Sequence, residues 1–219
     1  MMLDLPLFPL DTVLFPGMPL NLHIFEERYK QMINLCIDKR QPFGVVLISS
    51  GVAQNGPLAE PHMIGCTAQI TQVQPLGQGR MHIVAVGRDR FQIKSLRYDQ
   101  PYLVGEVELH PLQQDEAGTL KTSSEKLREL VNRYLTILQK AGQVPFDMRQ
   151  LPRDTMSLAY LASYMLQVSA EQKQSLLAAD RASLLLRELN KLYRREVLLL
   201  EALLSPPEQG ENASPFSLN

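Results

Sequence analysis

The chain has 219 residues, of which 45% are hydrophobic and 21% charged, a balance typical of a folded globular protein and not of a disordered one. Its 22 basic and 23 acidic side chains leave a formal net charge of −1, so the composition favours neither nucleic acid nor an anionic membrane as a partner. At roughly 150 residues per domain, one large domain or two small ones would fit this length.

Cysteine usage and the N-terminal sequence bear on the compartment. Only Cys36 and Cys66 occur, far apart and outside any C-x-x-C pair, which excludes a disulfide scaffold and a zinc ribbon and predicts reduced, buried thiols. The first nine residues lack the basic region of a signal peptide, and no stretch approaches the ~20 apolar residues that span a bilayer. We therefore expect a cytoplasmic protein that does not cross a membrane.

Glycine and proline divide the chain into two halves. Ten of the 12 glycines and ten of the 15 prolines precede residue 119. Closely spaced turn formers indicate strands, whereas a long glycine-poor stretch permits helices. Residues 1–118 hold 9 basic and 12 acidic groups, a net −3, and residues 119–204 hold 13 and 9, a net +4.

In the first half, alternation and β-propensity predict eight short strands in a closed or folded-over sheet. These are residues 3–8, 12–15, 20–24, 43–49, 64–74, 81–87, 90–98 and 103–110. The sequence Pro-Leu-Gly-Gln-Gly at 75–79 predicts a hairpin turn. One helix, over 26–38, interrupts the sheet with an apolar stripe. The stripe consists of Tyr29, Met32, Ile33, Cys36 and Ile37.

In the second half, the apolar period becomes helical after a polar linker over 110–119. A first helix has an apolar face from Leu127 to Ala141 and ends before Gly142. Asp154 caps a second helix, and Ser169 with Gln172 forms a capping box for a third. The last helix, over 180–204, carries leucine-rich stripes that we expect to be buried along its length. We therefore predict domains at 1–112 and 119–204, followed by a disordered tail over 205–219.

The last helix also carries a basic stripe. Arg187, Lys191, Arg194 and Arg195 recur at helical spacing, which predicts a solvent-exposed face.

Catalytic motifs are largely absent. The chain contains no P-loop, no G-x-S-x-G elbow and no H-E-x-x-H pair. Ser123 and Lys126 match S-x-x-K, but Thr122 and Glu125 offer a capping box at the predicted start of a helix. His62, Cys66 and His82 could approach zinc, without an evident fourth ligand. The sequence therefore predicts no catalytic, cofactor or metal site.

The most distinctive segment is apolar and rich in proline. Residues 5–10 read Leu-Pro-Leu-Phe-Pro-Leu, and residues 13–20 read Val-Leu-Phe-Pro-Gly-Met-Pro-Leu. Prolines keep such a segment extended and remove main-chain donors. It is either a set of edge strands covering the core or an exposed apolar surface that captures peptides.

These residues resemble the opening of the Lon protease N-terminal domain, the substrate-binding module also found in cereblon. The resemblance continues through Ile-Phe-Glu-x-Arg-Tyr at 24–29, Ile-Gly-Cys-Thr at 64–67, Gly-Arg-x-Arg-Phe at 87–91 and Pro-Tyr-Leu at 101–103. Residues 169–204 resemble the helical extension that follows in Lon. The resemblance implies an α+β fold, in which a twisted, PUA-like β pseudo-barrel precedes an α-helical bundle.

The resemblance also implies a function. In full-length Lon this region precedes an ATPase module and a serine-lysine peptidase, both missing from this chain, so proteolysis is not carried over. We expect a non-catalytic module that recognises unfolded or damaged polypeptide, without a cofactor, or acts as an adaptor. Its surface would include Phe15, Pro16 and Met18, extended by a cleft near Tyr160 and Tyr164.

The hypothesis also includes candidate binding partners and an alternative function. Unfolded polypeptides, a separate protease and a second copy of the chain are the candidate partners. The alternative is an RNA-binding PUA-like module, although the acidic first half argues against it.

Overall fold

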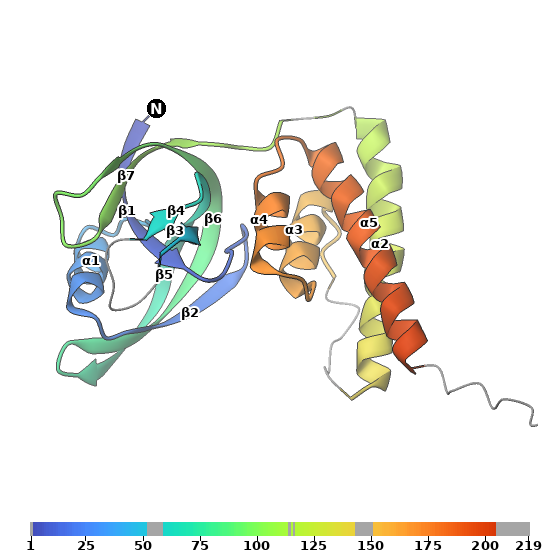
Figure 1. Cartoon of the computed structure of the whole chain (residues 1–219), viewed down its shortest axis with the longest axis horizontal. Coiled ribbons are helices and arrows are strands. Elements are labelled where there is room, and N and C mark those ends of the chain that lie inside the picture. The colour runs from blue at the N-terminus through green and yellow to red at the C-terminus, as the bar shows by residue number, and fades with distance from the viewer. Residues whose placement is uncertain (1, 52–58, 114, 116, 143–150, 205–219) are drawn as a thin grey trace, which may run out of the picture.

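The computed structural model describes residues 2–51, 59–113, 115, 117–142 and 151–204, and shows a β-barrel beside a helical bundle (Figure 1). The predicted α+β class is confirmed. The barrel contains β1 (Met2–Leu10), β2 (Pro19–Ile24), α1 (Glu27–Asp38), β3 (Phe43–Ser50), β4 (Glu60–Pro61), β5 (Ile64–Gly77), β6 (Arg80–Arg97) and β7 (Leu103–Leu109). The bundle contains α2 (Ala117–Lys140), α3 (Thr155–Met165), α4 (Ala170–Leu177) and α5 (Ala182–Leu204).

Five strands close into a ring. Their order is β1-β7-β6-β5-β3, and a parallel pairing between β1 and β3 completes the circle. The other neighbours in the ring are antiparallel. The strand β2 lies outside the ring, where it pairs antiparallel with residues 81–86 of β6. Among the described strands, the outer side of β2 and the stretch of β5 beyond Ala68 have no second strand partner.

The strand predictions are confirmed in part. Seven of the eight predicted segments lie largely in strands, and the two over 81–87 and 90–98 are halves of the single long strand β6. The hairpin over 75–79 is confirmed, with positive φ at Gly77, Gln78 and Gly79. The predicted strand over 12–15 is wrong, because its apolar side chains are buried in an irregular turn. The short strand β4 was not predicted.

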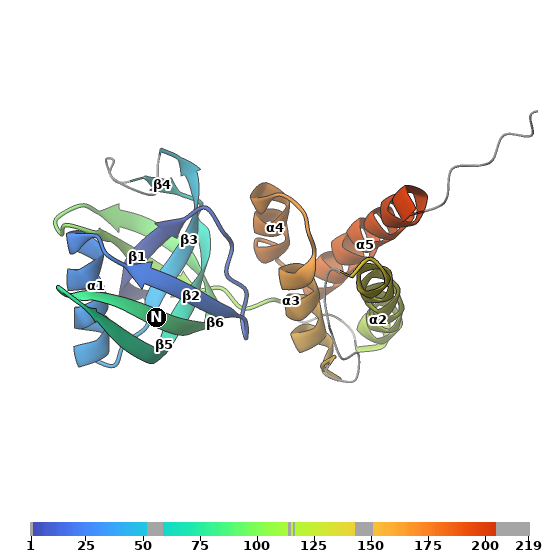
Figure 2. The same ribbon diagram turned by 90° about the horizontal axis from the view of Figure 1, so that it is seen from below.

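The helix α1 covers one end of the barrel. Tyr29, Met32, Ile33 and Cys36 are buried against residues of the sheet, as the apolar stripe predicts. Phe8 of β1 stacks on Tyr29 with 4.0 Å between ring centroids. The helix therefore lies at the end of the barrel opposite the bundle (Figure 2).

In the bundle, α3 and α4 lie between the barrel and the paired helices α2 and α5, as both ribbon views show (Figures 1 and 2). The predicted caps are confirmed: the Asp154 carboxylate accepts from the Ser157 N–H, and the Ser169 hydroxyl accepts from the Gln172 N–H. Gly142 has a φ of +71° just after α2, as a C′ glycine requires.

Two helix predictions need correction. The helix α2 begins at Ala117, so Thr122 and Glu125 lie inside it and do not form a capping box. The helix extends toward its N-terminus because Leu120 packs on the bundle core. The predicted burial of the last helix ends near Val197, because Leu199 and Leu203 are exposed by 51% and 79%.

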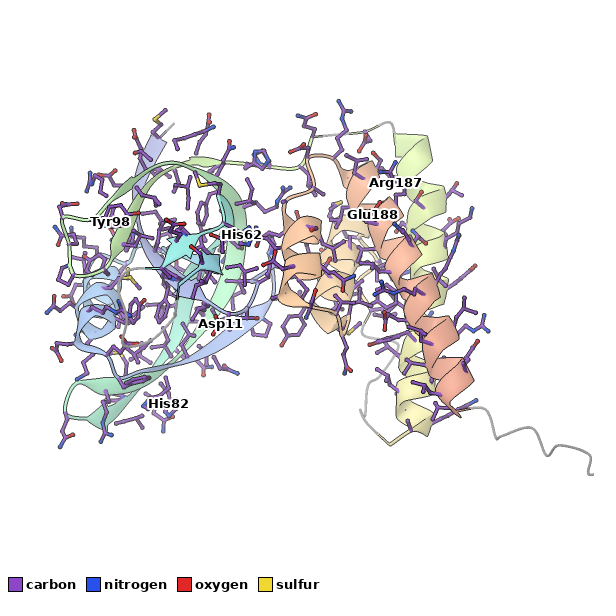
Figure 3. All side chains as sticks on the ribbon, in the orientation of Figure 1. Asp11, His62, His82, Tyr98, Arg187 and Glu188 are labelled. Atoms are coloured by element: carbon purple, nitrogen blue, oxygen red, sulfur yellow. The ribbon has the colours of Figure 1, made fainter. Side chains whose placement is uncertain are left out.

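The basic stripe of α5 is exposed as predicted. Its members Arg187, Lys191, Arg194 and Arg195 all lie at the solvent-facing side, where Figure 3 labels Arg187 beside Glu188. No helix in the described part of the chain is long and apolar enough to cross a membrane. The predicted tail over 205–219 lies outside the described residues.

The predicted linker over 110–119 ends earlier, because α2 begins at Ala117, and Gln113 and Asp115 of the linker contact the bundle. The Gln113 N–H donates to the carbonyl oxygen of Asp180 at 2.9 Å. The Asp115 carboxylate accepts from the Ser183 N–H at 2.8 Å and from the Ser183 hydroxyl at 3.0 Å. Asp115 thereby caps the first turn of α5 from a distant part of the chain.

Candidate functional site

The predicted site lies at the junction between the barrel and the bundle. The segment 13–18 crosses this junction between β1 and β2, and its turn is closed by the Met18 N–H, which donates to Phe15 O at 3.1 Å. Gly17 has a φ of +79°, a conformation that favours glycine. The Gly-Met-Pro sequence therefore ends the turn and starts β2.

The turn is hydrogen-bonded to Gly87 of β6. The Gly17 N–H donates to Gly87 O at 2.9 Å, and the Gly87 N–H donates to Met18 O at 3.0 Å. A Cβ added at Gly87 would lie 2.3 Å from Phe15 O. Only glycine fits this close backbone approach. The first glycine of the Lon-like motif at 87–91 is therefore required by the contact between β6 and the turn.

The five predicted site residues lie in one neighbourhood. Phe15 and Tyr160 of α3 are in ring contact, with 6.5 Å between centroids. Met18 packs on both the barrel core and the bundle core, and Pro16 is partly buried beside it. Tyr164, one turn beyond Tyr160, is 44% exposed. Their role in binding stays a prediction.

Phe15 itself is not available to a ligand. Its side chain is completely buried in a core shared by Val13, Leu47 and the bundle helices. The interpretation of this segment as a cover of the core therefore applies to Phe15. The accessible part of the junction consists of Pro16, Met18 and Tyr160, which are partly exposed, and Tyr164.

Arg90 of β6 fastens the barrel to the bundle. Its side chain is 3% exposed and donates from Nη2 to Ala179 O at 2.7 Å. Burial lowers the pKa of this guanidinium, an effect that the neighbouring Tyr160 and Asp180 oppose. Burial likewise raises the pKa of Tyr160, which Arg90 opposes. Tyr160 thus lies beside the buried guanidinium of Arg90 and is also in ring contact with Phe15.

Further polar contacts cross the same junction. The Gln174 side-chain amide of α4 donates to Ile64 O at 2.9 Å. His62 lies 3.4 Å from a Glu171 carboxylate oxygen, and His110 lies 3.4 Å from one of Asp180. Every one of these contacts joins a barrel residue to α4 or to the start of α5. They hold the bundle against the barrel in a fixed position.

The zinc candidates are not brought together. His62 faces α4, whereas His82 lies at the far lower end of the barrel (Figure 3) and stacks on His23 with 4.7 Å between centroids. Burial raises the pKa of the Cys66 thiol to about 12, which disfavours the thiolate that binds metal. Among the described residues, no group of three or more His, Cys, Asp or Glu side chains could hold a metal ion.

The S-x-x-K pair is part of the bundle. Ser123 lies inside α2, and its carbonyl oxygen accepts from the Asn190 side-chain amide at 3.1 Å. Lys126 is exposed on the same helix. The position of both residues is explained by helix packing.

The sequence did not predict one cleft of the barrel. This cleft, of about 360 Å³, is lined by the end of β1, by β2 and by residues at the start of α1. The stacked rings of Phe8 and Tyr29 line it, and Glu26 closes one end in an ion pair with Arg28 at 2.9 Å. The Arg28 guanidinium lies 4.7 Å from the centroid of the Tyr29 ring. The motif at 24–29 was a signal for this cleft, since it supplies Glu26 and Tyr29 of the lining and Arg28, which contacts both.

The fold and the site can be compared with known proteins. A profile of the ATP-dependent protease La (LON) substrate-binding domain matches residues 4–195, which include the barrel and most of the bundle. The chain belongs to this family. The motif residues Gly87, Arg90 and Tyr29 therefore maintain a Lon-type fold here through the contacts described above.

Relatives cover the same region. The chain is 26% identical to a Lon protease of Parabacteroides distasonis over 87% of its own length and 24% of that protein. It is 28% identical to a LON peptidase N-terminal domain and RING finger protein of Schizosaccharomyces pombe, over 80% of its own length and 42% of that protein. The chain thus spans about a quarter of the length of the Lon proteases that it matches.

Solved structures agree with the fold. A Lon N-terminal domain protein from Xanthomonas campestris superposes with a TM-score of 0.60 at 26% identity, covering 88% of this chain and 98% of that one. The N-terminal domain of the Mycobacterium avium complex Lon protease gives a TM-score of 0.64 at 20% identity, covering 87% of this chain and 98% of that one.

Proposed function

We propose that this Lon-type domain is a non-catalytic module that captures apolar segments of unfolded or damaged polypeptide in the cytoplasm. The family match over residues 4–195 carries the proposal, because that family is a substrate-binding domain. Captured chains would be held or passed to a separate protease, in the manner of an adaptor. A second copy of the chain is a further candidate partner.

The accessible part of the junction would make the contacts. Tyr164 offers an exposed aromatic ring, and Met18 offers a flexible thioether beside Pro16. Aromatic rings and methionine suit many different apolar segments, because they bury area without demanding one side-chain shape. Phe15 would support this surface from below through Tyr160. Binding of this kind is weak for each contact and low in sequence specificity.

A matched pair of tyrosine variants tests this surface. Tyr164→Ala removes an exposed ring at the junction, whereas Tyr98→Ala removes a 57% exposed ring at the opposite side of the barrel (Figure 3). The readout is the anisotropy of a labelled, permanently unfolded polypeptide. We expect Tyr164→Ala to weaken binding about fivefold to tenfold, as for a contact worth ~1 kcal/mol, and Tyr98→Ala to leave it unchanged. Equal affinities for both variants would place the binding surface elsewhere.

A further inference from the structure

The strand β2 has an unprotected edge. Among the described strands it pairs only with β6, over six residues and without a register shift. Its sequence, Pro-Leu-Asn-Leu-His-Ile, contains no charged residue. Exposed edges are normally blunted by lysine, proline or bulges, because unpaired N–H and C=O groups attract another strand. In β2 the single proline stands at the first position, where it interrupts nothing.

The other open edge in the barrel is protected. Beyond Ala68, the strand β5 no longer pairs with β3. This stretch contains register shifts near Ile70 and near Pro75, and its exposed residues include Val73 and Leu76 as well as polar ones. Bulges and an internal proline are devices that prevent strand addition. The strand β2 has no register shift and no proline after its first position.

The cleft beside β1 follows the edge of β2. Residues 21–26 line it, and four of them, 21–24, belong to β2. Successive side chains of a strand point to opposite faces, so a surface touched by all four strand residues runs along the edge of the main chain and not over one face. Phe8 and Tyr29 supply apolar area next to that edge.

The edge is continuous with the junction surface. β2 begins at Pro19, directly after Met18, and in Figure 1 it runs from the bundle side of the barrel toward α1. A chain held at Met18 and Tyr164 could therefore extend along β2 toward Phe25. Only an extended backbone supplies the alternating donors and acceptors that such an edge can pair.

We propose that the outer edge of β2 binds an extended, uncharged polypeptide segment by strand addition, with alternate side chains of the segment in the cleft beside Phe8 and Tyr29. The inference rests on the proposed function and specifies how a chain of almost any sequence is held. Main-chain hydrogen bonds supply affinity without reading sequence, and the cleft adds a preference for apolar side chains.

Backbone methylation of the ligand tests the hydrogen bonds without altering the protein. Three labelled peptides of one Val/Thr-rich sequence are compared: unmodified, N-methylated at alternate residues so that one edge stays free, and N-methylated at two adjacent central residues so that both edges are blocked. We expect the first two to bind alike and the third to bind about twofold to tenfold more weakly, since one of its two methyl groups removes a main-chain hydrogen bond to β2 whichever edge of the peptide is used. Equal binding of all three peptides would overturn the inference.

A second pair of variants tests the location. Asn21→Lys adds a charge to β2, and Gln72→Lys adds the same charge to an exposed position of β5. We expect only Asn21→Lys to weaken the unmodified peptide, by about tenfold, and amide exchange in β2 to slow when the peptide binds. Weakening by Gln72→Lys alone, or protein that sediments as a dimer with β2 already protected, would overturn it. If neither the peptides nor an unfolded polypeptide bind, the proposed function itself is wrong. If the unfolded polypeptide binds and methylation does not weaken peptide binding, only strand addition is refuted.

Discussion

Phe15 connects the barrel to the bundle, and its truncation should therefore affect stability first. The side chain has no exposed surface and packs on both parts of the chain. Replacing a buried Phe by Ala removes apolar surface that folding buries and leaves a cavity. Together these effects lower the free energy of unfolding by ~3–5 kcal/mol. Domains are typically stable by ~5–15 kcal/mol, so Phe15→Ala should remove a large fraction of the total. Phe15→Leu keeps most of the volume and should cost ~1 kcal/mol.

Urea unfolding followed by circular dichroism measures this effect, because the chain contains no Trp for fluorescence. Phe25→Ala is the matched control, since Phe25 is 40% exposed and should lose well under half as much stability. If Phe15→Ala kept the wild-type free energy of unfolding and instead lost polypeptide binding, Phe15 would be a ligand contact and the burial argument would be refuted.

Three further predictions follow from local contacts. Gly87→Ala should destabilise the protein by ~2–3 kcal/mol in urea, because the new Cβ meets Phe15 O; a smaller loss than 0.5 kcal/mol would contradict the close approach. Burial raises the pKa of Cys36 to about 11 and of Cys66 to about 12, while the unfolded chain ionises both near 9. The stability that these neutral thiols contribute is therefore complete below pH 9 and is lost as pH rises from 9 to 12. Cys36→Ala should make the free energy of unfolding fall less steeply with pH in this range. An unchanged slope would refute this. Asp154→Ala should cost ~1 kcal/mol at pH 7 and Asp154→Asn much less. The pKa of Asp154 is lowered chiefly by the Ser157 N–H, so part of the cost of Asp154→Ala should be lost as pH falls below about 4, while the neutral carboxyl still accepts this hydrogen bond as Asn would; a cost that does not change between pH 7 and pH 2.5 would contradict the cap.

Local patterns predicted those elements whose local and tertiary preferences agree. The stripe of α1, the hairpin at Gly77–Gly79 and the caps at Asp154 and Ser169 all follow from short-range rules and are present. The segment 12–15 shows the limit of such rules. Its β-branched and aromatic residues fit a strand, but the contact with Gly87, far away in the sequence, turns them into a buried bend.

The helical half shows the same limit. No local rule indicates that Asp115 caps α5, because Asp115 and Ser183, whose N–H it accepts, lie 68 residues apart in the sequence. Periodicity also does not show how far along a helix its packing partners extend. We therefore expected Leu199 and Leu203 to be buried, but both are exposed.

The candidate site was predictable as a neighbourhood but not as a surface. We expected a surface at Phe15 and Met18 that a cleft near Tyr160 would extend, and the structure shows the Phe15 and Tyr160 rings in contact. Which of them remains accessible depends on packing between distant segments, which spacing does not encode. The edge of β2 was hidden for a related reason, since the sequence reveals a strand but not which of its sides lacks a partner.

Polypeptide capture itself is tested most directly by fluorescence anisotropy with the intact chain. A labelled, permanently unfolded polypeptide and an RNA oligomer are each titrated at low and at high salt. The account predicts that the polypeptide binds and that its affinity changes little with salt, because apolar contacts and main-chain hydrogen bonds are not screened. Absence of polypeptide binding, or RNA binding that collapses as salt rises, would contradict it and favour a nucleic-acid module.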